Sequence, residues 1–240
     1  MVGRGGVVLV TDDAGASWRP QNSGTIKDLL AVCVRPDACT GWAAGDHGTI
    51  IATRDGGATW LAQPTPTRDV LWGLDFADAR IGWAVGLGGT ILHTRDGGDT
   101  WVLQDGGTSD DLFGVYAADS RTCWVVGDRG TVLSTRDGGR TWQRRTTDTT
   151  QNLNAVAFSA DGETAVAVGR SDTVLTSRDG GATWRAGSTG TGMSLWAVQL
   201  TSARQAWVAG DEGTVLSTSD GGSTWDRHPY SPAKDSVVHW

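Results

Sequence analysis

Short apolar runs recur along the chain in a fixed order, separated by polar segments rich in glycine and aspartate. A typical unit opens with LWGLDF from Leu71, continues through GWAVG from Gly82 and TILHT from Thr90, and closes with a short run that begins at Trp101. The runs hold four to six residues rich in Val, Ile, Leu, Thr and Trp. Runs of this length and composition, bounded by turn residues, are typical of antiparallel strands. The pattern therefore predicts four strands per unit, and helical periodicity is absent.

The segment before the fourth run sets the period of the repeat. It reads TRDGGATW from Thr53, and five similar segments occur elsewhere at spacings of 41 or 42 residues. Its aspartates are Asp13, Asp55, Asp96, Asp137, Asp179 and Asp220, and its tryptophans are Trp18, Trp60, Trp101, Trp142, Trp184 and Trp225. Four-stranded units repeated at this length are typical of β-propeller blades. We therefore predict an all-β propeller of six four-stranded blades of about 41 residues.

The aspartate segment is interpreted as a structural turn. Its carboxylate can accept backbone N–H groups within the loop. Its second glycine, Gly57 in the second copy, is present in all six copies and is expected at positive φ, whereas the first is replaced by Ala14 in the first copy. The tryptophan is expected to pack between blades. One carboxylate per copy is too few for Ca²⁺, which takes six to eight oxygens, so no metal and no cofactor are expected.

The two ends of the chain suggest how the ring closes. Residues 1–28 align with the second, third and fourth strands of a unit, and residues 235–240 fall where a first strand would stand. We expect the C-terminal strand to complete the N-terminal blade, which removes free sheet edges, and residues 1–240 to form a single domain. A cut inside a hairpin also fits a piece of a longer ring.

Charge and composition narrow the class of partner. The net charge is −7, with 27 acidic and 20 basic residues. Nucleic acid is therefore not expected, because phosphate binding needs clustered cations. No apolar run is long enough to span a bilayer. The four histidines show no ligand spacing and are expected at the surface: His47, His93, His228 and His239.

The three cysteines form no metal-binding pattern. Cys33, Cys39 and Cys123 are either thiols or, for the first two, a disulfide between paired strands.

Positions that differ between blades are the candidates for function, because positions that do not vary are explained by the packing that all blades share. The second residue of the first strand and the turn between the second and third strands vary, and both are expected on one face. In the second blade the alignment puts Ala31 at this position, after an invariant Leu30. The candidate partner-binding residues are Trp72, Phe113, Asn154, Trp196, Asp46, Asp128 and Asp211.

Exposed aromatic side chains beside carboxylates suit a peptide or a sugar. The alternative is that the aromatics pack between blades and the aspartates only form turns.

The motif Ser/Thr-x-Asp-x-Gly-x-Thr-Trp is the Asp-box, or bacterial neuraminidase repeat. Together with GWAVGLGGTILHTRDGGDTW, from Gly82, it resembles the photosystem II assembly and stability factor family. The resemblance covers nearly the whole chain. It implies a propeller that acts as a protein-binding scaffold, in the periplasm or outside the cell. Asp-boxes also occur in sialidases, xyloglucanases and lectin-like propellers, so the motif is specific for the fold and weakly specific for function.

An enzymatic role is less favoured than binding. Sialidases use a tyrosine, a glutamate and three arginines, and the tyrosines and glutamates here are Tyr116, Tyr230, Glu163 and Glu212. Glu163 falls in a hairpin turn on the face opposite the variable residues, and long insertions that could build a cleft are missing. A lectin with one pocket per blade would repeat its rim residues, whereas these differ. We therefore expect a monomeric, non-enzymatic scaffold for one protein or peptide partner, with a sugar as the alternative ligand.

Overall fold

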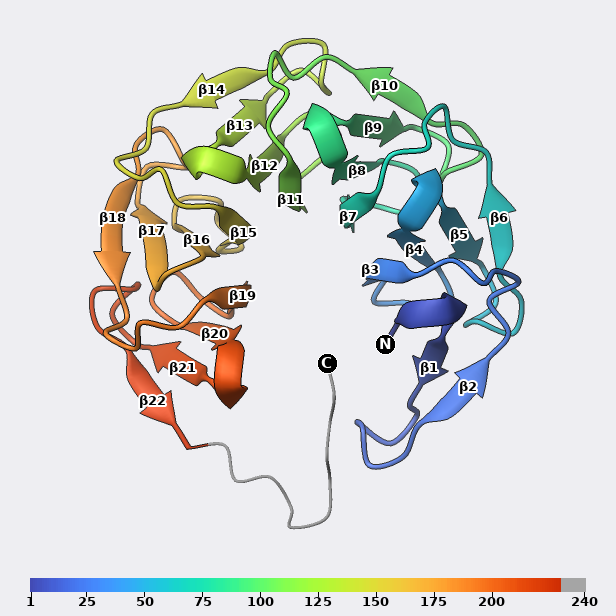
Figure 1. Ribbon diagram of the computed structural model, residues 1–240, viewed down its shortest axis with the longest axis horizontal. Helices are drawn as coiled ribbons and strands as arrows, with labels where there is room; N and C mark the ends of the chain where they lie inside the picture. The colour runs from blue at the N-terminus through green and yellow to red at the C-terminus, as the bar shows by residue number, and fades with distance from the viewer. Residues whose placement is uncertain (230–240) are drawn as a thin grey trace. The chain divides into compact units, whose positions relative to one another are not determined.

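The computed structural model describes residues 1–229, and within them the protein is all-β. Twenty-two strands and five single-turn 3₁₀ segments build six antiparallel sheets (Figure 1). The chain falls into two compact units, Met1–Leu153 (unit 1) and the residues from Asn154 onward (unit 2). The single domain expected over residues 1–240 stays a prediction.

Unit 1 holds a two-stranded sheet followed by three four-stranded sheets. The two-stranded sheet consists of β1 (Val8–Val10) and β2 (Arg19–Gln21). The others are β3 (Leu29–Val34), β4 (Gly41–Gly45), β5 (Ile50–Thr53) and β6 (Leu61–Gln63); β7 (Leu71–Phe76), β8 (Gly82–Gly86), β9 (Ile91–Thr94) and β10 (Val102–Gln104); and β11 (Leu112–Ala117), β12 (Cys123–Gly127), β13 (Val132–Thr135) and β14 (Gln143–Arg145).

Two further sheets follow, and all of their residues except Leu153 belong to unit 2. They are β15 (Leu153–Phe158), β16 (Ala165–Gly169), β17 (Thr173–Ser177) and β18 (Arg185–Ser188); and β19 (Leu195–Leu200), β20 (Ala206–Gly210), β21 (Val215–Thr218) and β22 (Asp226–His228). In every four-stranded sheet the strands pair in chain order, as successive hairpins. These are the predicted propeller blades, so the β-propeller fold class is confirmed.

The first sheet also carries part of a third strand. An antiparallel bridge joins Val2 to Val8, and the Gly3 N–H donates to the Val7 carbonyl at 2.9 Å. Residues 1–28 thus contribute two strands and one bridge to this sheet, and the split first blade expected from the sequence stays a prediction. The predicted closing strand, residues 235–240, lies outside the described residues.

The second strand of each unit 1 blade forms the centre of the packing. Trp42, Trp83 and Trp124 lie at the same position of β4, β8 and β12 and are at most 2% exposed. Trp42 stacks on Phe76 of the next sheet, with ring centroids 3.6 Å apart. Trp42 and Trp83 are buried because the following sheet of unit 1 covers them. In unit 2, Trp207 occupies this position in the last sheet of the chain and is 45% exposed.

Where an Asp-box tryptophan follows another sheet of the same unit, it packs against that sheet, but not all box tryptophans are buried. Trp101 joins the cluster that contains Trp42 and Phe76 and is 6% exposed. Trp60, Trp142 and Trp225 are only half-buried. Trp18 is 44% exposed, so the expectation that every box tryptophan is an anchor between blades is wrong for this one. It belongs to the first sheet, which has no preceding sheet in unit 1 to pack against.

The cysteines are free thiols, and the disulfide alternative is wrong. Cys33 lies in β3, where it pairs with Trp42, whereas Cys39 lies in the turn before β4. The Cys39 N–H donates to Asp37 Oδ1 at 2.8 Å, which fixes this residue in the turn. The two cysteines therefore do not occupy paired strands.

One histidine departs from the expected surface position. His93 lies in β9, is 4% exposed, and stacks on Trp83 with ring centroids 4.4 Å apart and planes 20° apart. Burial, followed by the positive charge of Arg95, lowers the pKa of His93 to about 4. The third strands of the other blades place small residues here, such as Ala52 and Ser134, and the sequence alone did not indicate that an imidazole could replace them.

Candidate functional site

The first strands carry the predicted variable positions, and strand register shows which residues are equivalent. Leu71 pairs with Gly86, Leu112 with Gly127 and Leu195 with Gly210, and each pairing is followed by a register shift. In the second blade Leu29 is the residue that pairs, with Gly45. The equivalent of Trp72 is therefore Leu30, and the sequence alignment that chose Ala31 was wrong by one residue.

Three of these side chains follow one another along unit 1. Leu30, Trp72 and Phe113 come from β3, β7 and β11, which lie next to one another in Figure 1. Leu30 is 44% exposed, and the two aromatic side chains are half-buried. The rings of Trp72 and Phe113 contact each other at 5.1 Å between centroids, tilted by 54°. We call Leu30, Trp72 and Phe113 the apolar row.

Within the described residues, five sheets each carry a single-turn 3₁₀ segment, and the segments of unit 1 border this row. The five segments are η1 (Arg4–Gly6), η2 (Asp46–Gly48), η3 (Leu87–Gly89), η4 (Asp128–Gly130) and, in unit 2, η5 (Asp211–Gly213). Segment η1 contacts β3, η2 contacts β7 and η3 contacts β11. Each of these three turns therefore lies against the first strand of the next sheet, which places turns and first strands of unit 1 on one face.

The predicted aspartates begin these turns. The N–H groups of Asp46, Asp128 and Asp211 donate to carbonyls of the segments before the first strands, at 2.8–2.9 Å. The Asp211 side chain also accepts a hydrogen bond from Trp196 Nε1 at 2.6 Å. The structure thus brings Trp196 and Asp211 together, while each aspartate also has the turn-forming role that the alternative proposed.

Asn154 has a structural contact of its own. Its Nδ2 donates to the Leu195 carbonyl at 2.8 Å and so links β15 to β19 in unit 2. Asn154 is half-buried, and its hydrogen bond to the Leu195 carbonyl connects two neighbouring sheets. Its role in binding stays a prediction.

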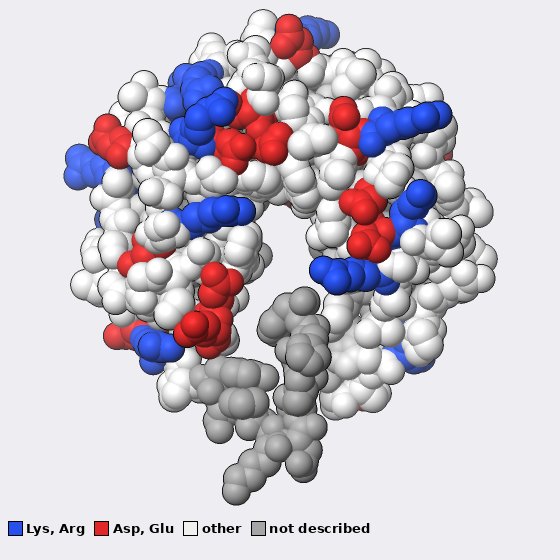
Figure 2. All heavy atoms as spheres, in the orientation of Figure 1, with Lys and Arg blue, Asp and Glu red and all other residues white. Residues whose placement is uncertain are grey.

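A charged cluster in unit 1 was not found from the sequence. Asp110 is 3% exposed, accepts hydrogen bonds from Thr131 Oγ1 and Arg144 Nη1, and forms an ion pair with Arg129. Arg129 follows Asp128 in η4, and Arg144 lies in β14. Elsewhere on the face turned toward the viewer, Figure 2 shows acidic and basic side chains interspersed with larger uncharged areas.

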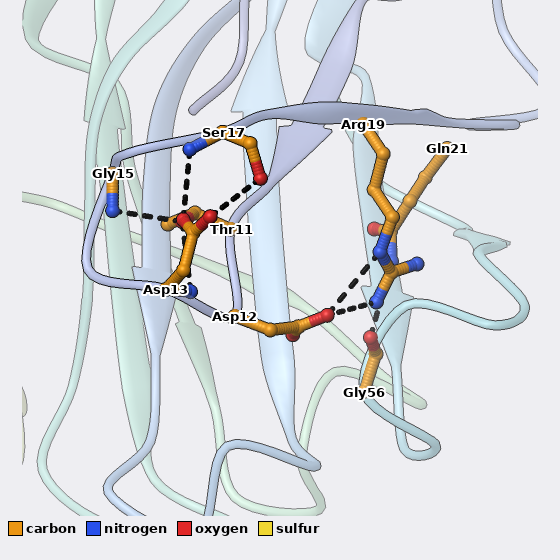
Figure 3. Close-up of polar contacts among 8 residues, drawn as sticks. All are labelled: Thr11, Asp12, Asp13, Gly15, Ser17, Arg19, Gln21 and Gly56. Atoms are coloured by element: carbon orange, nitrogen blue, oxygen red, sulfur yellow. Dashed lines mark hydrogen bonds and ion pairs between the residues drawn. The ribbon is translucent and has the colours of Figure 1, made fainter.

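The Asp-box is a self-contained turn, shown for the first copy in Figure 3. Asp13 Oδ1 accepts bonds from the Ser17 N–H at 2.8 Å and from Thr11 Oγ1 at 2.7 Å, while Asp13 Oδ2 accepts one from Ser17 Oγ at 2.6 Å. Thr11 Oγ1 in turn accepts from the Gly15 N–H at 2.8 Å. Hydrogen bonds to Ser17 lower the pKa of Asp13 to about 2.

All six copies repeat this network. The aspartates of the later copies accept the same three kinds of bond from a Thr or Ser two residues before and a Thr four residues after. The second glycines have positive φ, as predicted; the first positions do too, including Ala14 at 57°. The carboxylates are thus engaged by the loop itself, which is a structural role.

Neighbouring boxes are also tied together. In unit 1 Gln21 Nε2 donates to the Gly56 carbonyl at 3.1 Å, and Arg54 pairs with Asp99 of the next box at 2.9 Å. In unit 2 Arg178 Nη2 donates to the Asp220 carbonyl at 3.0 Å. Arg54 and Arg178 therefore each join two consecutive blades of one unit. Across residues 1–229, no helix has the length and apolar character that crossing a bilayer requires.

Comparison with known proteins gives a family. The model of the photosynthesis system II assembly factor YCF48 matches residues 11–103 and 107–191. No curated protein matches the chain closely enough in sequence to count as a relative.

Several solved structures are similar in fold. YCF48 bound to D1 peptide is 20% identical with a TM-score of 0.73, over 94% of this chain and 75% of that one. YCF48 from Cyanidioschyzon merolae is 20% identical with a TM-score of 0.70, over 95% and 80%. The GH74 enzyme of Niastella koreensis is 15% identical with a TM-score of 0.71, over 95% and 46%. At such identities the likeness shows the fold alone.

The matched residues make up well over half of the chain and contain five of the six Asp-boxes in full, each at the turn before a fourth strand. The chain therefore belongs to the photosynthesis system II assembly factor YCF48 family.

Proposed function

We propose that the protein is a non-enzymatic scaffold that binds a peptide segment of a protein partner on the apolar row of unit 1. The observation that carries this proposal is the contact between Trp72 and Phe113, two half-buried aromatic side chains at positions where the strand register imposes no particular residue. Leu30 extends the row by one blade.

Physical reasons favour a peptide as the ligand. Aromatic side chains that are already packed against each other lose little conformational freedom on binding, and they provide most of the binding energy at many interfaces. The row is bordered by the turns that carry Asp46, Leu87 and Arg129, so polar and charged groups surround an apolar centre. This is the usual anatomy of a protein interface.

The comparisons support the same class of ligand. One structure of similar fold is of YCF48 bound to D1 peptide. A peptide on the apolar row would give this chain a comparable binding activity, with its own residues in contact.

Hydrolysis and sugar binding are less well supported. Glu163 lies at the Asp-box end of its sheet, where its carbonyl accepts the Gly180 N–H at 2.9 Å, whereas the turn between β16 and β17 lies at the other end of that sheet. Similarity to GH74 enzymes is a similarity of fold. The first-strand residues differ from blade to blade, which favours one asymmetric ligand over repeated sugar sites.

A peptide-display library selected on the full chain, together with a synthetic D1 peptide, tests the proposal. Trp72→Ala/Phe113→Ala should weaken the selected peptides by at least about tenfold, since central aromatic residues dominate such interfaces. The matched control is Leu61→Ala/Val102→Ala, which removes two exposed apolar side chains from the fourth strands β6 and β10.

The control variant should bind as the unmodified chain does, and near-ultraviolet circular dichroism should show that both variants are folded. The proposal is wrong if the library yields no binder, or if both double variants weaken the selected peptides equally.

A further inference from the structure

Unit 2 contains a pocket of about 570 Å³ beside the last 3₁₀ turn. Its lining residues are Trp196, Ala209, Gly210, Asp211, Glu212 and Gly213. These residues come from β19, β20 and η5 of a single sheet. The pocket lies in unit 2, whereas the apolar row lies in unit 1.

Comparison with the other sheets shows what is particular about this pocket. The first-strand residue faces the turn of its own sheet through the same strand pairing each time. The combinations are Leu30 with Asp46-His47, Trp72 with Leu87-Gly88, Phe113 with Asp128-Arg129, Asn154 with Ser171-Asp172, and Trp196 with Asp211-Glu212. Only the last combines an aromatic residue with two carboxylates and no cation. The shared backbone does not require this, because the same turn accepts His, Gly and Arg elsewhere.

The indole is held in place and remains accessible. Trp196 Nε1 donates to Asp211 Oδ1 at 2.6 Å, which orients the ring, and the side chain is still 48% exposed. The faces of an indole attract cations, and this attraction increases when a carboxylate stands beside the ring. A cation resting on Trp196 would have the Asp211 carboxylate at the edge of the same ring.

The charge of the pocket is not balanced by the sheet itself. Within residues 1–229, neither Asp211 nor Glu212 forms an ion pair, whereas the buried Asp110 of unit 1 has both Arg129 and Arg144. Arg227 lines a second hollow with Glu212, Gly213 and Pro229, and it makes no ion pair with Glu212. Two exposed carboxylates beside an indole therefore present a negative, partly aromatic surface to a ligand.

We propose that this pocket binds the cationic side chain of a lysine or arginine presented by a peptide. The ammonium or guanidinium group rests against the Trp196 indole, and Asp211 and Glu212 supply the opposite charge. The volume is large enough for such a side chain, and the apolar ring accommodates its methylene groups.

Nuclear magnetic resonance with the full chain provides the test. Acetyl-Gly-Gly-Lys-Gly-Gly-amide is titrated into ¹⁵N-labelled protein, with the arginine and glutamine versions of the peptide in parallel. The indole N–H peak of Trp196 is assigned as the one lost in Trp196→Phe. The lysine and arginine peptides should shift this peak and the amide peaks of Gly210 and Gly213 saturably, and added salt should weaken binding. The glutamine peptide should not shift them.

Variants then separate the contributions. Asp211→Asn/Glu212→Gln should weaken binding of the lysine peptide roughly 2- to 10-fold, as expected for two solvent-exposed ion pairs. Trp196→Leu, followed through the glycine amides, should weaken it ~2- to 5-fold. Should the double variant not fold, Glu212→Gly replaces it, because a glycine occupies the same turn position in η3.

Matched controls come from the same unit. Glu163→Gln removes an exposed carboxylate from another turn, and Trp207→Phe changes the other exposed tryptophan of the same sheet. Both should bind the lysine peptide unchanged, as should Trp72→Ala/Phe113→Ala, so this proposal and the one above can fail separately. Equal shifts with the lysine and glutamine peptides, no shift at the highest soluble concentration, or equal weakening by Glu163→Gln would each overturn the assignment.

Discussion

The buried imidazole of His93 predicts that the protein loses stability in mild acid. Burial keeps His93 neutral in the folded state down to a pKa of about 4, whereas the unfolded chain takes up the proton near the ordinary histidine pKa of 6.5. Between these values the unfolded state binds more protons, so the free energy of unfolding falls as the pH is lowered. The stabilisation is complete above about pH 6.5 and lost by about pH 4.

The size of the effect follows from the two pKa values. Each pKa unit corresponds to about 1.4 kcal/mol, so the interval gives an upper bound of about 3 kcal/mol. Arg95 contributes part of the shift through solvent, where its charge is screened, and discounting that part leaves about 2 kcal/mol. The side chain is 4% exposed and its Nε2 has no hydrogen-bond partner within the described residues, so no nearby acceptor stabilises the charged form.

Urea unfolding at pH 7 and at pH 4.5 measures this loss in the unmodified chain and in His93→Phe. The phenyl ring can keep the stacking on Trp83 without titrating. The unmodified chain should lose about 2 kcal/mol more than the variant over this interval. His47→Asn, which replaces an exposed imidazole in η2, is the matched control and should retain the full loss. Equal pH dependence in the unmodified chain and His93→Phe would refute the reasoning.

Three further predictions concern the framework. Asp55 accepts hydrogen bonds from Thr59 and Thr53 that lower its pKa to about 2, so the stabilisation they provide should be present above about pH 4 and disappear toward pH 2. Asp55→Asn should therefore lower the melting temperature at pH 7, and should lower it by less at pH 2.5. Asp110→Ala should reduce the free energy of unfolding in urea by about 2 kcal/mol because it removes a buried, multiply bonded carboxylate, whereas Arg144→Ala, a change at a half-exposed side chain, should cost less than about 1 kcal/mol. A Cβ on Gly86 would overlap the Val70 carbonyl, whereas a Cβ on Gly88 would meet open space at a φ of 63°. Gly86→Ala should therefore lower the free energy of unfolding in urea by more than about 3 kcal/mol and Gly88→Ala by about 1 kcal/mol, and equal decreases in the two variants would contradict this explanation.

Features that repeat in the sequence could be predicted from it. The 41-residue period, the four strands and the turn role of the Asp-box all follow from local patterns, and the box is stabilised by hydrogen bonds between residues at most four apart. Local chemistry of this kind is visible in a sequence because its donors and acceptors are near neighbours in the chain.

Features that depend on packing between strands could not be predicted. The register shift after Leu29 moved the exposed position in β3 from Ala31 to Leu30, and the Leu-Leu pair gave no signal to distinguish the two. The burial of His93 depends on β8 and β10, its neighbours in the sheet. The pairing of Asp110 with Arg144 joins residues 34 apart, and one acidic and one basic residue at that distance have no recognisable pattern.

The carboxylate of each Asp-box takes its hydrogen bonds from the eight residues of its own box, and this affects how such a chain can change over time. A gene segment encoding one blade can be copied or lost without altering the turn chemistry of the blades on either side. What the copy has to match is the sheet before it, through the indole of its box and the hydrogen bonds between neighbouring boxes. Families built this way are free to vary in blade number and in rim residues while the turn itself stays constant.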